Sequence, residues 1–270
     1  MYLPVPTQLD CATAWLQAVR HVNSQRGHEA YNVIIDVEDP IRSTTLQNPI
    51  VGAVDLFLKA RKKSIATVSN TIFPYALYRR YGSPEFINAF RERVLPKVRR
   101  SERWSGYYFE RMISGSDNEG GQLGNIIGRM KDSNNPSLNK YELAIFDPRR
   151  DVDGSPYGGQ CLSFLSFKIL SGTPSVLNLT AIYRNHYYIE KLLGNLIGLG
   201  QLMAYMASEA NLSVGSLTVV STHATIDSPG GAKRSEIETL INTCQGAIRV
   251  TPNPSLPADQ TPPDQFRKTG

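Results

Sequence analysis

Residues 188–210 read YIEKLLGNLIGLGQLMAYMASEA, and this stretch limits the possible folds more than any other part of the sequence. At helical spacing its apolar residues cover nearly all sides of the predicted helix, a pattern typical of a helix buried in the centre of a domain. Its most apolar part, Leu192 to Met206, is too short and too interrupted by glycine to span a bilayer. The sequence therefore predicts a central helix with other elements packed around it.

The remaining elements mix strands and helices in no regular order. Strands are predicted at 31–37, 141–146 and 216–221, and helices at 7–23, 51–62, 85–95 and 237–244. Because the two kinds do not alternate as they do in a doubly wound sheet, we expect an α+β domain. The segment GLGQLM at 198–203 lacks the third glycine of a phosphate-binding loop and lies inside the predicted central helix, so packing explains it better.

A chain of 270 residues is long enough to bury a substantial core, as one large domain or as two small ones. We expect one domain that covers residues 1–250. The last twenty residues, TPNPSLPADQTPPDQFRKTG, contain five prolines and few side chains that a core could bury. The sequence therefore predicts a proline-rich, disordered tail over residues 251–270.

Charge and cysteine content restrict the compartment and the class of ligand. The net charge of +5 suits an anionic ligand, and the sequence has no long basic block of the kind that binds a nucleic-acid backbone. The three cysteines, at 11, 161 and 244, follow neither a disulfide pattern nor a zinc-ligand pattern, which favours a reducing compartment. The N-terminal MYLPVPTQLD lacks the basic start and apolar stretch of a signal peptide. We expect a cytoplasmic protein with no metal site, no membrane contact and no nucleic-acid partner.

One cysteine lies in a segment with the pattern of a β-hairpin. In residues 161–170 and 177–184 successive side chains would face opposite sides, as they do in a strand. The turn-forming sequence Ser-Gly-Thr-Pro at 171–174 lies between them. Cys161 and Arg184 are equidistant from the centre of this turn, so they are expected to lie opposite each other. A cation beside a thiol stabilises the thiolate, which predicts a lowered pKa and a nucleophilic Cys161. A small buried structural cysteine is the other interpretation of the same residue.

The residues that follow this hairpin resemble a known enzyme family in their order and spacing. The order is Cys161, Arg184-Asn185, Asn195, a Leu-x-x-Gly segment at 212–215, and His223, with eleven residues from Arg184 to Asn195. This order resembles the thymidylate synthase family, and looser matches lie at Arg42-Ser-Thr-Thr45, at 122–128 and at Lys140. The resemblance implies a thymidylate synthase-like mixed sheet packed with helices and a homodimer formed through the sheet.

The resemblance also implies a role for each matched residue. Cys161 corresponds to the nucleophile that adds to carbon 6 of a uracil ring, which enables carbon 5 to attack a one-carbon unit. The implied nucleotide-binding residues are Arg42, Arg184 and Asn185 at the phosphate, Lys140 at the phosphate bound by the other subunit, Asn195 at the pyrimidine edge, and His223 at a sugar hydroxyl. Taken singly, each has an ordinary structural interpretation, such as an exposed loop cation for Arg42.

The chain differs from the family on the side that handles the one-carbon donor, methylenetetrahydrofolate. Asn70 lies near the place of the family's glutamate, Tyr187 replaces the aspartate that holds the pterin, and aromatic residues at 107–109 stand where the family has tryptophans. Leu162 follows the cysteine in place of a histidine. The residues on the nucleotide side match the family better than those on the folate side.

Two classes of function fit this pattern. The first is a pyrimidine nucleotide C5 transferase that moves a hydroxymethyl or methyl group to a uracil-type nucleoside monophosphate through a covalent adduct of Cys161, with methylenetetrahydrofolate as the implied cofactor. Hydroxymethylation fits better than dTMP synthesis, because it needs only water to trap the exocyclic intermediate. The second is a nucleotide-binding protein of the same fold that has lost folate chemistry and acts in regulation or assembly.

Overall fold

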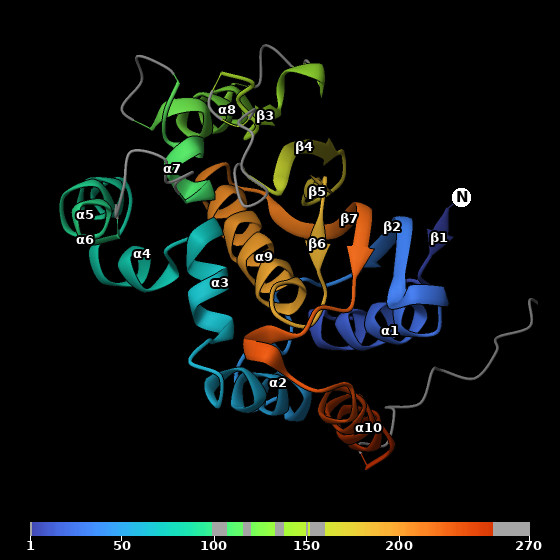
Figure 1. The fold of residues 1–270 in the computed structure, drawn as a ribbon. Coiled ribbons are helices and arrows are strands. Elements are labelled where there is room, and N and C mark those ends of the chain that lie inside the picture. Colours follow the sequence, from blue (N-terminus) through green and yellow to red (C-terminus); the bar gives the residue numbers. More distant parts are fainter. Residues whose placement is uncertain are drawn as a thin grey trace, which may run out of the picture.

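A computed structural model of the chain describes residues 2–98, 107–115, 120–132, 138–149, 151 and 160–250. Within these residues one mixed sheet has the strand order β1–β2–β7–β5–β4–β3, and β6 pairs with β7 beyond the end of β5 (Figure 1). The strands are β1 (Leu3–Pro4), β2 (Glu29–Val37), β3 (Glu142–Ala144), β4 (Leu162–Leu170), β5 (Val176–Tyr183), β6 (His186–Tyr187) and β7 (Ser213–Thr225). Parallel pairs such as β5–β7 adjoin antiparallel pairs such as β2–β7, and helices pack against the sheet, so the predicted α+β class is confirmed.

Helices supply the rest of the described fold. They are α1 (Cys11–Asn23), α2 (Pro49–Lys59), α3 (Ile65–Ile72), α4 (Tyr75–Tyr81), α5 (Glu85–Arg93), α6 (Leu95–Val98), α7 (Tyr108–Met112), α8 (Gly121–Lys131), α9 (Leu192–Glu209) and α10 (Arg234–Val250), with 3-10 turns at Arg26–His28, Leu138–Lys140 and Pro229–Gly231. The first helix begins later than its sequence pattern predicts. The Asp10 side chain accepts a hydrogen bond from the Thr13 backbone N–H at 2.8 Å, and this cap fixes the start of α1 at Cys11.

α9 is the central helix that the sequence predicts. Its residues are buried nearly all round, and in Figure 1 it lies between α3 and the strands β5 and β7. A Cβ atom at Gly194 would lie 2.6 Å from the Cβ of Val68 on α3. A Cβ atom at Gly200 would lie 2.3 Å from the carbonyl oxygen of Pro40. The glycines of this helix therefore allow close packing of its neighbours, as expected for the GLGQLM segment.

The two faces of the sheet differ in burial. On β2 the side chains of Val33, Ile35 and Val37 are fully buried on the face that packs against α1. The alternate residue Ile34 and its cross-strand neighbour Val220 on β7 point to the opposite face and are half-buried. One face of the sheet therefore belongs to the core, and the other is partly open to solvent.

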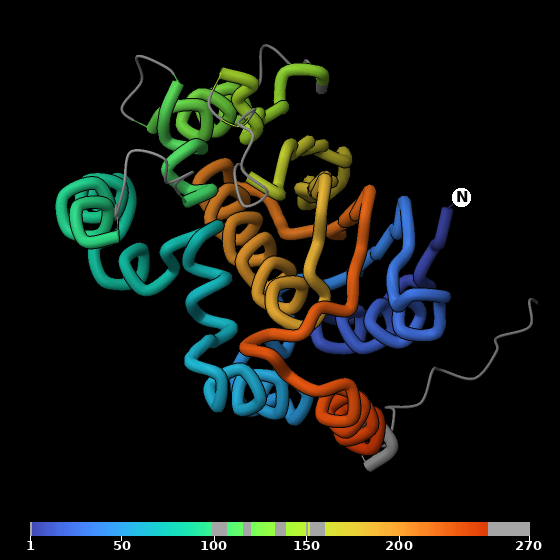
Figure 2. Tube along the Cα trace, in the orientation of Figure 1, coloured from blue at the N-terminus to red at the C-terminus, as the bar shows by residue number. Residues whose placement is uncertain are grey.

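The last described helix closes one end of the fold. α10 packs beside α2, and Figure 2 shows how the chain leaves β7 to reach that position. The predicted tail at 251–270 lies outside the described residues. Among the helices that the structure describes, none combines the length and apolar character needed to cross a membrane.

Candidate functional site

The predicted hairpin is present as β4 and β5, and its open end brings Cys161 and Arg184 together. Near the turn the two strands pair in a register that would place Arg184 opposite Leu162. A β-bulge between Leu162 and Phe164 shifts the register by one residue. The Arg184 backbone N–H consequently donates to the Cys161 carbonyl oxygen at 2.9 Å. The predicted pair is correct, and the bulge, which the sequence pattern did not show, is needed to form it.

Two cations lie within electrostatic reach of the Cys161 thiol. The positive charges of Arg184 and Lys191 both act to lower the pKa of this thiol. Arg184 Nε donates to the Gln160 carbonyl oxygen at 3.0 Å, and its guanidinium carbon lies 5.4 Å from the centre of the Phe146 ring. Because Arg184 is exposed, an anionic ligand can reach it from solvent.

The pKa of the Cys161 thiol is raised, whereas the sequence predicts a lowered pKa. Burial raises the pKa of this thiol above its ordinary value, and the charges of Arg184 and Lys191 offset only part of that rise. Burial also raises the pKa of Cys244 to about 12 and raises the pKa of Cys11. The predicted lowered pKa is therefore wrong, because the sequence pattern did not show how deeply the thiol lies. Of the three cysteines, Cys161 is still the one that cations favour as a thiolate.

Two tyrosines that the sequence did not mark as site residues flank Cys161. The Tyr108 hydroxyl lies beside the backbone of Leu162 and Cys161, and burial raises the pKa of Tyr108. Tyr183 is fully buried, and its hydroxyl has no hydrogen-bond partner within the described part of the chain. Burial is the main cause that raises the pKa of Tyr183 well above its usual range, and the neighbouring Tyr108 and Cys161 raise it further. Both phenols are therefore protonated at neutral pH and place hydroxyl groups near the thiol.

Asn195, the predicted pyrimidine contact, lies in the first turn of α9 and is only 3% exposed. Its side-chain nitrogen lies 2.9 Å from Nε2 of His186. The ring of His186 stacks on the ring of Tyr183 with their centres 4.0 Å apart. His186 and Tyr183 therefore connect Asn195 to the surroundings of Cys161. His186 is not predicted from the sequence, because its partners come from other elements and no local pattern indicates their contact.

Two further predicted residues, Asn185 and His223, are hydrogen-bonded to each other. Asn185 lies at the break between β5 and β6, and His223 lies on the neighbouring strand β7. His223 Nδ1 is 2.9 Å from Asn185 Oδ1, and His223 Nε2 is 3.2 Å from the carboxylate of Glu29. Since Asn185 follows Arg184 directly, this polar pair stands next to the cation at the hairpin end.

The other two predicted residues do not join this group within the chain. Arg42 is exposed in the loop between β2 and α2, and Lys140 is exposed in the turn before β3. Across the described residues, neither side chain forms a hydrogen bond or an ion pair with Cys161, Arg184 or Asn185. A role for these two cations at a phosphate stays a prediction.

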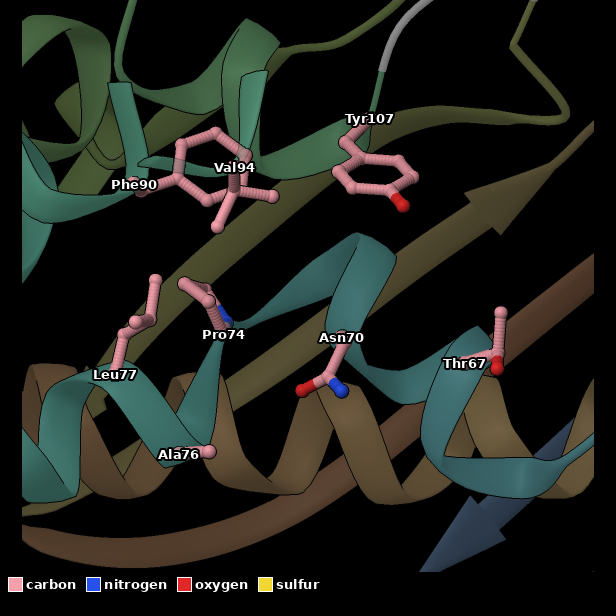
Figure 3. Close-up of a pocket in the computed structure, with 8 residues that line it drawn as sticks. All are labelled: Thr67, Asn70, Pro74, Ala76, Leu77, Phe90, Val94 and Tyr107. Carbon is pink, nitrogen blue, oxygen red and sulfur yellow. The ribbon is translucent and has the colours of Figure 1, made fainter. Parts of the chain in front are cut away.

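A pocket of about 260 Å³ opens beside α3 (Figure 3). Its lining residues are Thr67, Asn70, Pro74, Ala76, Leu77, Phe90, Val94 and Tyr107. Asn70 and Tyr107, both compared above with the folate side of the family's site, face this pocket from different walls. Tyr107 directly precedes Tyr108, so one short segment borders both the pocket and Cys161. Among the described residues that line the pocket, none is a carboxylate that could replace the family's glutamate.

Comparison with known proteins points to a distant relative. No protein-family model matches the chain. A protein of Methanopyrus kandleri described as "Putative thymidylate synthase" is 31% identical over 140 residues, which make up 51% of this chain and 61% of that protein. The chain thus spans about three fifths of the length of the curated relative that it matches. This match supports a distant thymidylate synthase-like relationship.

Proposed function

We propose that this protein is a divergent pyrimidine nucleotide C5 transferase, which moves a hydroxymethyl or methyl group to a uracil-type nucleoside monophosphate through a covalent adduct of Cys161. The observation that carries the proposal is the pairing of Cys161 with Arg184 at the open end of the hairpin, with Lys191 as a second cation. The distant relationship to the protein described as "Putative thymidylate synthase" supports the same chemistry.

Covalent addition by Cys161 explains why a thiol and cations are needed together. Carbon 5 of a uracil ring is a poor nucleophile until a thiolate adds at carbon 6 and moves an electron pair to the ring enolate, which then attacks the one-carbon unit. Because burial raises the pKa of Cys161, the thiol is protonated in the free protein, and during addition its proton passes to water as the bond from sulfur to carbon 6 forms. Arg184 and Lys191 favour the thiolate at that step, and the protonated phenols of Tyr108 and Tyr183 are suited to donate hydrogen bonds rather than to act as bases.

The nucleotide phosphate would be held by cations from two chains. Arg184 combines two uses of one charge, since a guanidinium that favours the thiolate also binds a phosphate. Asn185 and Arg42 of the same chain and Lys140 of the other chain in a homodimer would complete the phosphate site. The half-buried face of the sheet is the surface through which we propose the dimer forms. Asn195 would contact the pyrimidine edge, and His223 would bind a sugar hydroxyl.

The one-carbon half of the site favours hydroxymethyl transfer. Asn70 and Tyr107 line the pocket of Figure 3, where methylenetetrahydrofolate or another one-carbon donor would approach the base. The described lining of this pocket has no carboxylate to organise reduction of the exocyclic methylene, so we expect water to add to that carbon and yield a hydroxymethyl group. The same lack of a carboxylate favours the second candidate function, a nucleotide-binding protein that has lost folate chemistry.

The domain limits and the compartment are part of the proposal. We place the thymidylate synthase-like domain at residues 1–250 and the tail at 251–270. Three free cysteines, of which Cys11 and Cys244 are buried, suit a reducing compartment such as the cytoplasm.

Calorimetric titration with UMP, dUMP, CMP and dCMP tests the nucleotide site. We expect the unmodified protein to prefer uracil nucleotides by about 1 to 3 kcal/mol, the cost of leaving a buried polar group unpaired. Asn195→Asp should shift the preference toward cytosine, because a carboxyl group matches the amino group and N3 of that ring, while phosphate affinity stays nearly unchanged. Asn242→Asp, which adds the same charge at an exposed position on α10, is the matched control. Tighter binding of cytosine nucleotides by the unmodified protein would show that other groups contact the ring.

A further inference from the structure

Four buried polar side chains form a continuous hydrogen-bond chain that ends at Asn195. The Tyr188 hydroxyl donates to Ser221 Oγ at 3.2 Å, and Ser221 Oγ lies 2.9 Å from His186 Nδ1. His186 Nε2 lies 2.9 Å from the Asn195 amide. All four residues are at most 3% exposed, so neighbouring side chains rather than water must satisfy their polar atoms.

His186 is neutral in this chain. Its burial lowers the pKa of the imidazole to about 3, so the ring carries a single proton at physiological pH. A neutral imidazole offers one N–H donor and one acceptor nitrogen. The proton can therefore be on Nδ1, which faces Ser221, or on Nε2, which faces Asn195. In the first case Nε2 accepts a hydrogen bond from the Asn195 amide N–H, and in the second case Nε2–H donates to the amide oxygen.

Counting hydrogens along the chain decides between these choices. With the proton on Nδ1, His186 and Tyr188 would both donate to Ser221 Oγ, and the hydroxyl hydrogen of Ser221 would have no acceptor within the described residues. With the proton on Nε2, Tyr188 donates to Ser221, Ser221 donates to Nδ1, and Nε2–H donates to Asn195. Only the second arrangement gives a partner to every hydrogen of Tyr188, Ser221 and His186, and an unpaired polar group in a fully buried residue such as Ser221 is costly. The two amide hydrogens of Asn195 are then left for a ligand.

The position of this proton fixes the orientation of the Asn195 amide. A donor at His186 Nε2 requires the amide oxygen to face it, whereas the structure has Nδ2 at that place. The arrangement therefore needs a half-turn about the terminal bond of the Asn195 side chain, which exchanges Oδ1 with Nδ2. The amide N–H groups of Asn195 then point away from His186. A donor presented to a pyrimidine matches the O4 acceptor of uracil and opposes the C4 amino group of cytosine.

We propose that His186 is a positioning residue, which Ser221 holds with its proton on Nε2 so that the Asn195 amide presents its N–H groups to the base and favours uracil over cytosine. The inference rests on the proposed function, since it takes Asn195 as the group that contacts the base. Neither His186 nor Ser221 touches the nucleotide in this arrangement; both act through Asn195.

Nitrogen-15 NMR of the ligand-free protein, labelled at histidine, locates the proton directly. The signals of His186 are identified by their loss in His186→Gln. We expect the proton on Nε2 in the unmodified protein and in Tyr188→Phe, which keeps the Ser221 donor. Ser221→Ala removes that donor, so Nδ1-protonated His186 should appear. A proton on Nδ1 in the unmodified protein overturns the proposal, even if Ser221→Ala does not fold.

Nucleotide affinity then tests the consequence for specificity. We expect the ratio of uracil to cytosine nucleotide affinity to fall by on the order of tenfold in Ser221→Ala and to stay unchanged in Tyr188→Phe. The matched control removes a hydrogen bond from the same chain without releasing His186, so a general loss of stability would affect both variants alike. An unchanged ratio in Ser221→Ala overturns the proposal. If the unmodified protein binds none of the four nucleotides, the proposed function fails and the positioning role fails with it, whatever nitrogen carries the proton.

Discussion

Buried His186 is expected to make the protein sensitive to acid. The imidazole has an ordinary pKa of 6.5, and burial lowers it to about 3 in the folded chain. Between these two values the unfolded state binds a proton that the folded state does not, so the free energy of unfolding falls as the pH falls. The slope is about 1.4 kcal/mol per pH unit. At about pH 4.5, two units below the ordinary pKa, the protein should have lost roughly 3 kcal/mol through this one group.

Replacing the imidazole isolates this contribution from that of every other titrating group. His186→Gln keeps a polar side chain beside Asn195 but cannot take up the proton. Urea unfolding from about pH 7.5 down to about pH 4.5 should therefore show the stability of the variant rising relative to the unmodified protein by roughly 3 kcal/mol. Ser221→Ala is the control, because it disturbs the same hydrogen-bond chain and leaves the imidazole buried. Parallel pH curves for His186→Gln and the unmodified protein would refute the assignment of the acid sensitivity to His186.

Two further predictions concern packing and assembly. Gly194→Ala should destabilise the protein by about 1 to 3 kcal/mol in urea unfolding, because its Cβ would clash with α3, whereas Gly128→Ala on α8, where a Cβ meets nothing within 4 Å, should stabilise it by about 0.5 to 1 kcal/mol. Equal effects of the two substitutions would show that α9 and α3 do not pack closely. Mixing Lys140→Ala chains with Arg184→Ala chains should restore nucleotide binding that each lacks alone, because one site of the mixed dimer then has both cations. A monomer in sedimentation at micromolar concentration would exclude such sharing.

The sequence predicted those parts of the fold that depend on local patterns. The apolar stretch around residues 192–209 predicts a buried helix, and α9 is that helix. A helix with apolar side chains on all its sides has to be covered by other elements on all its sides. The turn at 171–174 likewise predicts the hairpin of β4 and β5. The bulge beside Leu162 was not predictable from strand alternation, because the apolar residues Leu162, Phe164 and Leu165 occupy both phases of the alternation at that point.

The electrostatics of the candidate site depended on contacts between distant segments. Arg184 was placed opposite Cys161 by the hairpin, but the pKa of the thiol is raised by burial, which comes from residues far away along the chain, among them Tyr108. His186 was missed for the same reason. Its partners Ser221 and Asn195 lie on β7 and α9, and no spacing within the segment at 186–189 indicates that they meet.

Release of tritium from 5-tritiated dUMP tests most directly whether Cys161 adds to the pyrimidine ring. Addition of the thiolate at carbon 6 lets carbon 5 take up a proton from water, and reversal then releases tritium into the solvent, with methylenetetrahydrofolate or without it. We predict release by the unmodified protein and by Cys244→Ser, and none by Cys161→Ser. Binding of dUMP without any release would contradict covalent catalysis and favour a nucleotide-binding protein, and release that persists in Cys161→Ser would show that another group attacks the ring.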